Sequence, residues 1–196
     1  MTPSPVTLTG RTIRLEPLSP AHGPSLAELA KDAEIFRWFT ISLASPTAFE
    51  KWMADAFAAQ AAGTAIPFAT IRIADGRVIG STRFMSISEH DRRYEIGSTW
   101  LTLSAQRTAA NTEAKYLMLR HAFETFGARR VELKTHVRND KSRRAIERLG
   151  AVFEGTHRNH MLMPDGTMRD SVWYSITDTE WPAARARLET WLHPGA

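Results

Sequence analysis

A run of small residues, where an extended segment gives way to a helix, is the part of this sequence best suited to bind an anion. The stretch from Thr99 to Lys115 ends an apolar segment and enters a helix after Thr108, Ala109 and Ala110. Backbone N–H groups in the first turn of a helix have no partner within it, and the helix dipole adds partial positive charge there. Side chains this small would let a pyrophosphate approach the backbone closely. The same pattern fits a simple helix cap, so this stretch alone leaves both interpretations open.

Positive charge is concentrated a little further along the chain. The formal net charge is +4 and the isoelectric point is near 9.8, and the excess lies between Arg129 and Arg148. Such a basic stretch attracts polyanions, among them RNA, an acidic protein surface or a small ligand with several phosphates. A solvated face of a strand and a helix has the same composition. The charge is therefore compatible with an anionic partner but does not identify it.

The chain has the length and composition of one globular domain. It contains 196 residues, of which 43% are hydrophobic and 23% charged, and no linker or repeat divides residues 1–196. The absence of cysteine excludes disulfides, a cysteine nucleophile and thiolate-bound metals. No apolar run approaches the roughly 20 residues needed to cross a bilayer, and residues 1–10 lack a secretory pattern. We therefore expect a cytoplasmic protein with no membrane partner.

Hydrophobic spacing and turn residues predict the elements that would position these groups. Strands are expected at about 12–18, 66–74, 78–87, 92–103, 129–136, 152–163 and 168–176. Helices are expected at about 22–31, 46–62, 111–126, 140–149 and 179–192. Asp75-Gly76 and Pro164-Asp165-Gly166 predict hairpin turns.

This order predicts an α+β fold. The single domain would have a core at about 11–178 and a C-terminal amphipathic helix at about 179–192. A central mixed sheet, mostly antiparallel, would be flanked by helices, and the strand-helix-strand unit at 92–136 would be its parallel part. The run of small residues lies between the fourth strand and the third helix.

Several segments in this order resemble the GNAT family of acyl-CoA-dependent N-acetyltransferases. The segments are Tyr94-Glu95-Ile96-Gly97 to Trp100-Leu101, Asn111-Thr112-Glu113-Ala114-Lys115, and Asn139 through Leu149-Gly150 to Glu154-Gly155. The resemblance covers nearly the whole chain and is to the branch that includes the ribosomal-protein N-terminal acetyltransferases. It implies acetyl-CoA as the cosubstrate and no metal. It also implies direct attack, in a ternary complex, by a primary amine that belongs to a protein N-terminus or a small molecule.

The resemblance further implies which residues form the phosphate loop and bind the pyrophosphate of CoA. The family's phosphate loop corresponds to Gln106, Ala109 and Asn111, with alanine where the family has a glycine that is free to adopt a positive φ. Backbone N–H groups from Arg107 to Thr112 would hold the pyrophosphate. The implied cofactor-binding residues are Leu101, Leu103, Gln106, Arg107, Thr108, Ala109, Ala110, Asn111, Thr112, Asn139 and Arg143.

Residues outside the phosphate loop would bind the rest of CoA. By the same resemblance, Leu101 and Leu103 would pair by main chain with the pantetheine arm, and Asn139 would hydrogen-bond it. Arg143 or Arg144 would meet the outer phosphates, which would explain the basic stretch without nucleic acid.

Three groups are the implied catalytic residues. Glu95 would accept the proton of the amine, directly or through water, although it also fits a structural partner of Arg92 or Arg93. The backbone N–H of Leu101 would polarise the thioester carbonyl. Ser142 would protonate the departing thiolate, although a serine in a first helical turn is also an ordinary structural residue.

The proton donor is where the chain departs from the family. Many members place a tyrosine four residues before the glycine that ends the fourth helix, and this chain has Ile146 there. Tyr116, Tyr174 and solvent are the remaining alternatives.

Other functions and partners stay open. An RNA- or ribosome-binding module would use the basic stretch, although we expect no nucleic acid if CoA explains the charge. A non-catalytic acyl-CoA sensor would fit Ala109 and Ile146, and a homodimer would fit the Pro164-Asp165-Gly166 hairpin with the last helix. His157 and His160, three residues apart on a predicted strand, should point to opposite faces, which argues against a shared metal.

Overall fold

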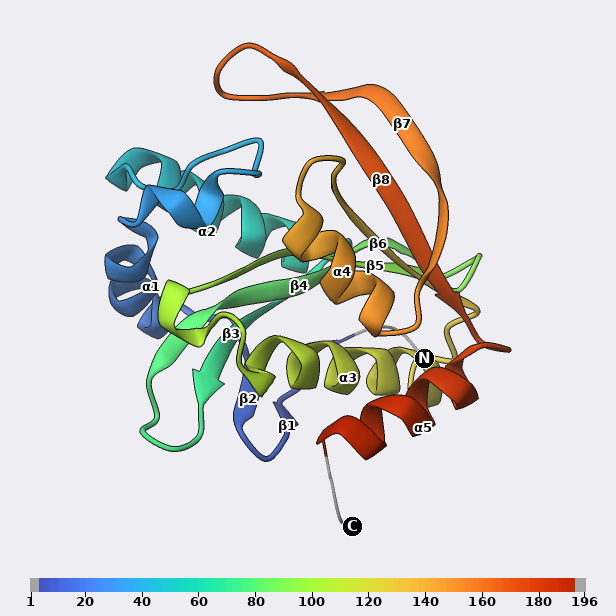
Figure 1. Ribbon diagram of the computed structural model, residues 1–196. Helices are drawn as coiled ribbons and strands as arrows, with labels where there is room; N and C mark the ends of the chain where they lie inside the picture. Colours follow the sequence, from blue (N-terminus) through green and yellow to red (C-terminus); the bar gives the residue numbers. More distant parts are fainter. Residues whose placement is uncertain (1–3, 193–196) are drawn as a thin grey trace.

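The structure, a computed structural model, describes residues 4–192 and builds them around one eight-stranded sheet (Figure 1). The strands are β1 (Leu8–Thr9), β2 (Ile13–Pro17), β3 (Ile66–Arg72), β4 (Val78–Ser88), β5 (Arg93–Leu101), β6 (Arg130–His136), β7 (Val152–Leu162) and β8 (Met168–Thr177). Their order in space is β1-β2-β3-β4-β5-β6-β8-β7. Among the described residues, β5 and β6 form the one parallel pair. The predicted mixed sheet and its parallel unit are confirmed.

The helices of the described residues match the predicted ones in number and order. They are α1 (Gly23–Ala30), α2 (Pro46–Ala61), α3 (Ala109–Glu124), α4 (Asp140–Arg148) and α5 (Trp181–Leu192), with short 3-10 turns at Pro20–His22, Ala33–Phe36 and Leu103–Ala105. Side-chain oxygens of Ser45, Thr108 and Asn139 cap α2, α3 and α4. No helix within residues 4–192 combines the length and apolar character of a membrane span.

Two predicted boundaries beside the run of small residues are wrong. β5 ends at Leu101 rather than at Leu103, because Leu103 begins a 3-10 turn in which its carbonyl accepts a hydrogen bond from the Gln106 N–H. α3 begins at Ala109 rather than at Asn111, because the cap is Thr108. The connection between β5 and α3 therefore has the predicted length but lies two residues earlier, at 102–108, and contains a 3-10 turn.

Helices cover both faces of the sheet. α3 and α5 pack on each other below the sheet in Figure 1, and α2 lies above it. The described residues form two hydrophobic clusters, one on each face of the sheet, and side chains of β3 point into both. Ile66 and Phe68 pack in the cluster with α3, and Ala69 and Ile71 pack in the cluster with α1 and α2. The sheet is thus buried on both sides at its centre.

β5 and β6 are paired only at their beginning. The register runs from Arg93 opposite Arg130 to Glu95 opposite Glu132 and goes no further. β5 continues beside β4 through a register shift, and Ser98 within that shift has a φ of 48°. Because a bulge of this kind bends a strand, β5 turns away from β6 and its edge beyond Glu95 stays open.

Glu113 of α3 ties this helix to the turn between β1 and β2. Its carboxylate accepts hydrogen bonds from the N–H groups of Arg11, Thr12 and Ile13 at 2.7–2.8 Å. A Cβ at Gly10 would lie 2.4 Å from the carboxyl carbon, so only glycine leaves room for it. Burial raises the pKa of Glu113, but hydrogen bonds from the Thr12 side chain and from these backbone groups lower it by more.

Glu113→Gln should destabilise the fold, because an amide nitrogen would face N–H groups that need an acceptor. We expect a loss of about 1–3 kcal/mol in urea unfolding at pH 7. Since the folded-state pKa of Glu113 is lowered, its contribution is present above the unfolded-state pKa and is lost as the pH falls through the folded-state pKa. The variant should therefore lose less stability than the parent in acid. Glu50→Gln, on the exposed side of α2, is the control and should change neither quantity.

Candidate active site

A cleft of about 1270 Å³ opens where β5 and β6 part. Its walls come from the start of α3, from α4, from residues 34–41 and from the β7–β8 hairpin. The predicted site residues that line it are Glu95, Leu101, Leu103, Gln106, Arg107, Thr108, Ala109, Asn111, Thr112, Asn139 and Ser142. Ala110 and Arg143 do not line it.

The run of small residues forms the N-terminal turn of α3 at the mouth of this cleft. The Thr108 hydroxyl accepts the N–H of Ala110 at 3.2 Å and donates to the carbonyl of Ala105 at 2.7 Å. In the connection between β5 and α3, Arg107 has a positive φ of 60°, whereas Ala109 is the first residue of the helix. Position 109 therefore does not require the positive φ that glycine adopts freely, because α3 begins at Ala109 with a helical backbone.

Gln106 connects β5 to α4. Its amide donates to the Leu101 carbonyl at 3.0 Å, and its side-chain oxygen accepts a hydrogen bond from Lys141. Asn139 caps α4 by accepting the N–H of Ser142 at 3.1 Å, which leaves the Asn139 amide group as a donor on the cleft wall. The elements on either side of the open strand edge are thus held at fixed positions.

The N–H of Leu101 faces the open edge of β5. The N–H of Thr102 donates to the carbonyl of Ile79 in β4 at 2.9 Å. Because successive backbone N–H groups of a strand point to opposite edges, the Leu101 N–H points away from β4. This is the direction that the role expected for Leu101 requires.

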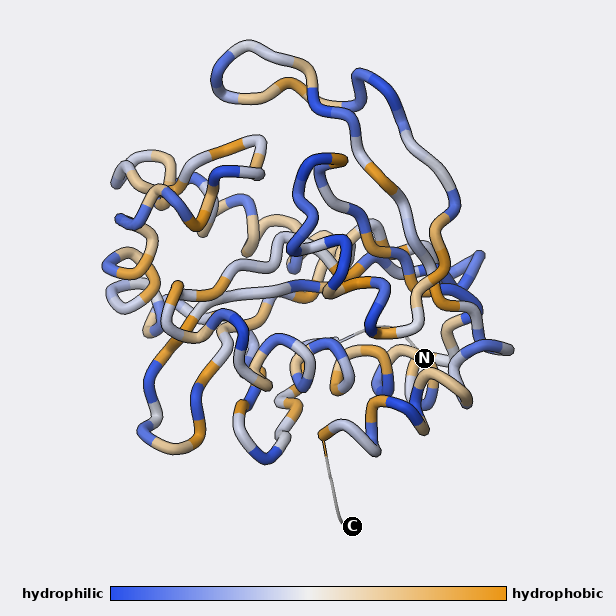
Figure 2. The backbone as a smooth tube through the Cα atoms, viewed as in Figure 1, coloured by the Kyte–Doolittle hydropathy of each residue, from blue (hydrophilic) through white to orange (hydrophobic). Residues whose placement is uncertain are grey.

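The cations near the start of α3 differ from those expected. Arg143 turns to the other side of α4, where it donates to the Tyr174 hydroxyl at 3.2 Å and to the Val137 carbonyl at 3.3 Å. Arg107, Lys141 and Arg148 line the cleft instead. Figure 2 shows α4 as hydrophilic along most of its length, and the helical rotation per residue decides which of its cations reach the cleft.

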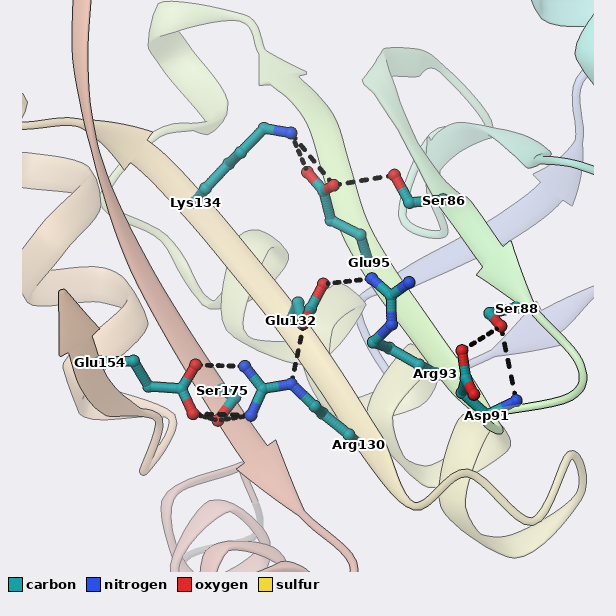
Figure 3. A network of polar contacts seen from close by, with 10 residues as sticks. All are labelled: Ser86, Ser88, Asp91, Arg93, Glu95, Arg130, Glu132, Lys134, Glu154 and Ser175. Carbon is teal, nitrogen blue, oxygen red and sulfur yellow. Dashed lines mark hydrogen bonds and ion pairs between the residues drawn. The ribbon is translucent and has the colours of Figure 1, made fainter. Parts of the chain in front are cut away.

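Glu95 is the buried carboxylate of the cleft, with 1% of its surface exposed. Both of its oxygens lie 3.1 Å from the Lys134 Nζ, and one also accepts the Ser86 hydroxyl at 3.0 Å (Figure 3). Its partner is therefore Lys134 and not Arg92 or Arg93, since Arg93 pairs with Glu132 at 3.1 Å. The β6 lysine reaches the carboxylate across the two strands just where they begin to part.

The tyrosines considered as proton donors are engaged elsewhere. Tyr116 donates to Glu189 of α5 at 2.7 Å, and Tyr174 donates to Glu147 of α4 at 2.9 Å. Neither lines the cleft, whereas Ser142 and Ile146 do. Ser142 is thus the hydroxyl of α4 that the cleft contains.

Lys115 is a cleft residue that the sequence reasoning missed. Its Nζ donates to Thr99 at 2.5 Å and to Thr82 at 3.3 Å, and it has no carboxylate partner among the described residues. Burial lowers its pKa from 10.5 to about 7. The helical spacing in the sequence could have identified Lys115 as buried, because it lies four residues before Leu119 and therefore on the same, buried face of α3.

The expectation that His157 and His160 point to opposite faces is wrong. Their ring centroids are 5.4 Å apart, and both rings lie against Trp173. A register shift between β7 and β8 and the positive φ of Asn159, 48°, turn the strand between them. No group of three or more side chains suited to a metal occurs within residues 4–192.

Comparisons with known proteins agree with this fold. A profile of the acetyltransferase (GNAT) domain matches residues 12–152, and the chain therefore belongs to the GNAT acetyltransferase family. A GCN5-related N-acetyltransferase from Brucella melitensis superposes with a TM-score of 0.90 at 35% identity, over 99% of this chain and 88% of that one.

Two further similar proteins bear on the branch within the family. YdaF of Bacillus subtilis (strain 168), named as a candidate ribosomal N-acetyltransferase, is 31% identical over 107 residues, which are 55% of this chain and 57% of YdaF. The match thus spans little more than half the length of that relative. RimJ of Mycobacterium smegmatis, solved with CoA-disulfide, has the same fold, with a TM-score of 0.83 at 22% identity over 95% of each chain.

Lys115→Met should remove a pH dependence from the stability of the fold. Since the folded-state pKa of Lys115 is lowered to about 7, the unfolded chain binds one proton more between about pH 7 and 10.5. The parent's unfolding free energy should therefore rise with pH across that window, by up to about 1.4 kcal/mol per pH unit from this group. Urea unfolding at pH 7, 8 and 9 measures it. The rise should shrink in Lys115→Met and persist in Lys51→Met, at the exposed Lys51 of α2; an equal rise in both variants would contradict the assignment.

Proposed function

We propose that the protein is an acetyl-CoA-dependent N-acetyltransferase that acetylates a primary amine, either a protein N-terminus or a small molecule. The observation that carries the proposal is one cleft that joins an open strand edge, a helix N-terminus and a buried carboxylate. Membership of the GNAT family supports it. The name of YdaF supports the ribosomal-protein branch, and the CoA-disulfide complex of RimJ supports CoA as the ligand.

The residues present suit the chemistry of CoA. The first turn of α3 offers N–H groups to the pyrophosphate, and the cations for the outer phosphates are Arg107, Lys141 and Arg148 rather than Arg143. The open edge of β5 offers the main chain of Leu101 to the pantetheine amides, and the Asn139 amide faces the same cleft. Leu103, 50% exposed in its 3-10 turn, would contact the ligand through its side chain.

The proposed chemistry uses three groups of this cleft. Glu95 accepts the proton of the attacking amine, directly or through water, while Lys134 holds the carboxylate in place. The Leu101 N–H stabilises the charge that develops on the thioester oxygen. The thiolate leaves with a proton from Ser142 or from water, since its ordinary pKa near 8.5 makes it a tolerable leaving group.

The alternative of an RNA-binding module is less well supported. Basic residues of the 129–148 stretch form ion pairs within the protein: Arg129 with Asp178, and Arg130 with both Glu132 and Glu154 (Figure 3). Others of them line the cleft. These ion pairs and the cations in the cleft reduce the positive charge that remains for an external polyanion.

Calorimetry and a turnover assay together test the proposal. Acetyl-CoA and CoA should each bind, and thiol release should follow when a panel of amines and N-terminal peptides is added. Intersecting initial-velocity lines would indicate a ternary complex. Binding without thiol release would support the sensor, and no binding of either compound at millimolar concentration would overturn the proposal.

Glu95→Gln should lower kcat at neutral pH by about 10²–10⁴-fold, the usual contribution of general-base catalysis. The loss should shrink at high pH, where the acceptor amine is already neutral. Thiol release measured from pH 7 to pH 10 checks this. Glu50→Gln removes an exposed carboxylate of α2 outside the cleft and should keep the parent profile. A loss independent of pH would count against Glu95 as the base.

Ala109→Asp should weaken CoA binding, because it adds a negative charge in the first turn of α3, where the pyrophosphate is proposed to lie. We expect about a tenfold or greater rise in Kd by calorimetry, equivalent to about 1.4 kcal/mol. Ala183→Asp places the same charge in the first turn of α5, outside the cleft, and should leave Kd unchanged. Unchanged affinity in Ala109→Asp would move the phosphate site away from this loop.

A further inference from the structure

Three arginines surround Trp38 in the cleft. The guanidinium carbons of Arg37 and Arg138 lie 5.3 Å and 5.9 Å from the centroid of the indole ring. Arg169 donates to the carbonyl oxygen of Trp38 at 3.2 Å. The arginines come from the segment after Ala33–Phe36, from the turn between β6 and α4, and from β8, and all of them line the cleft. Three distant parts of the chain thus bring positive charge to one place.

Among residues 4–192 no carboxylate forms an ion pair with any of the three arginines. The acidic residues that line the cleft are Glu34, Glu95 and the exposed Asp140, which lies 3.9 Å from Arg143. Glu34 is exposed, and Glu95 is already paired with Lys134. In the neighbouring hairpin, Asp165 accepts from Thr167 and is exposed, at a distance where the charge of Arg138 contributes a minor part to the lowering of its pKa. Asp170 accepts from the Asn159 N–H.

Arg169 is the most informative of the three because it is buried, with 8% of its surface exposed. A guanidinium has five N–H donors. The contacts of Arg169 within the protein are one hydrogen bond to the Ser171 hydroxyl, at 3.0 Å, and one to Trp38. A buried charge without a counter-charge is costly, and an anionic ligand would relieve that cost.

The neighbouring histidines are in a positive environment. Burial lowers the pKa of His136, and the charges of Arg169 and Arg138 lower it further. Burial likewise lowers the pKa of His160, with further contributions from Lys134, His157 and Arg169. The lowered pKa values favour the neutral form of both rings and reflect the positive charge that surrounds them.

The arginines lie at the acceptor end of the cleft. Glu95 and Leu101 are six residues apart on β5, about 20 Å of extended chain, and the first turn of α3 lies beyond Leu101. Arg169 is close enough to Glu95 for the carboxylate to oppose the effect of burial on the pKa of that guanidinium. An anion held by Arg169 would thus stand near the proposed base and far from the cations of α3 and α4.

We propose that the acceptor is an amine that carries a carboxylate a few bonds away, and that Arg169 and Arg138 bind this carboxylate while the amine lies beside Glu95. The inference rests on the proposed function and names the substrate class of the same cleft. A carboxylate matches the paired donors of a guanidinium. The positive surroundings also disfavour an ammonium, so they favour the neutral amine that must attack and disfavour polycationic acceptors.

Acceptors that differ in one charge test this inference. Three peptides that share one sequence except for Glu, Gln or Lys at the second residue are compared by kcat/KM in thiol release. A free amino acid and its amide form a second arm, which separates a small acceptor from a peptide. We expect the carboxylate-bearing member of each usable set to be preferred by about tenfold or more over its neutral match, and the Lys peptide to be poorest.

Substitutions of the cleft arginines test whether these residues cause the preference for an acceptor with a carboxylate. Arg169→Gln should reduce the preference for the acidic acceptor several-fold through KM, with the KM for acetyl-CoA unchanged. Arg138→Gln, at an exposed residue, tests the same site if the buried substitution impairs folding. Arg158→Gln, on β7 outside the cleft, is the matched control and should keep the preference.

Equal use of the three peptides and of both small acceptors, or a preference that survives in both cleft variants, would overturn the inference. Absence of thiol release with every amine would instead overturn the proposed function.

Discussion

The short pairing between β5 and β6 is the constraint on which the rest of the site depends. Three residues of each strand are in register, and a bulge at Ser98 then carries β5 away. β5 keeps its place beside β4 because Gly80 allows close contact; a Cβ there would lie 2.1 Å from the Trp100 carbonyl oxygen. An open strand edge inside a domain would normally be a liability. Here it faces a cleft in which a ligand can satisfy it.

Charge is divided in the structure between two uses. On the sheet face shown in Figure 3, Arg93, Arg130 and Glu132 belong to a chain of ion pairs that holds the paired halves of β5 and β6 together. At both ends of the cleft lie cations that form no ion pair with a carboxylate of residues 4–192. The same basic stretch of sequence therefore stabilises the sheet and provides a binding surface for anions. The boundary between the two uses is Glu95, where the strands part.

Much of the fold and of the site could be predicted from the sequence, since both depend on local patterns. The hairpins at Asp75-Gly76 and Pro164-Asp165-Gly166 and the parallel unit follow from turn chemistry and periodicity. Boundaries at the 3-10 turn were missed because Leu103 continues the apolar pattern of β5. The partner of Glu95 was missed because Lys134 lies on a different strand, at a distance in sequence that no local pattern reports.

The sequence by itself determined the kind and order of the main helices and strands, and with them the family to which the chain belongs. Only the tertiary structure decided which side chains meet. The five residues between Arg143 and Arg148 rotate α4 by about 1.4 turns, which sends Arg143 to Tyr174 and leaves Arg148 in the cleft. A bulge brings His157 onto the side of His160, and the core around α3 buries Lys115. Trp38 gathers three arginines from separate elements. The physical reason is that helix and strand formation depend on neighbours in the chain, whereas burial, ion pairing and pKa depend on neighbours in space.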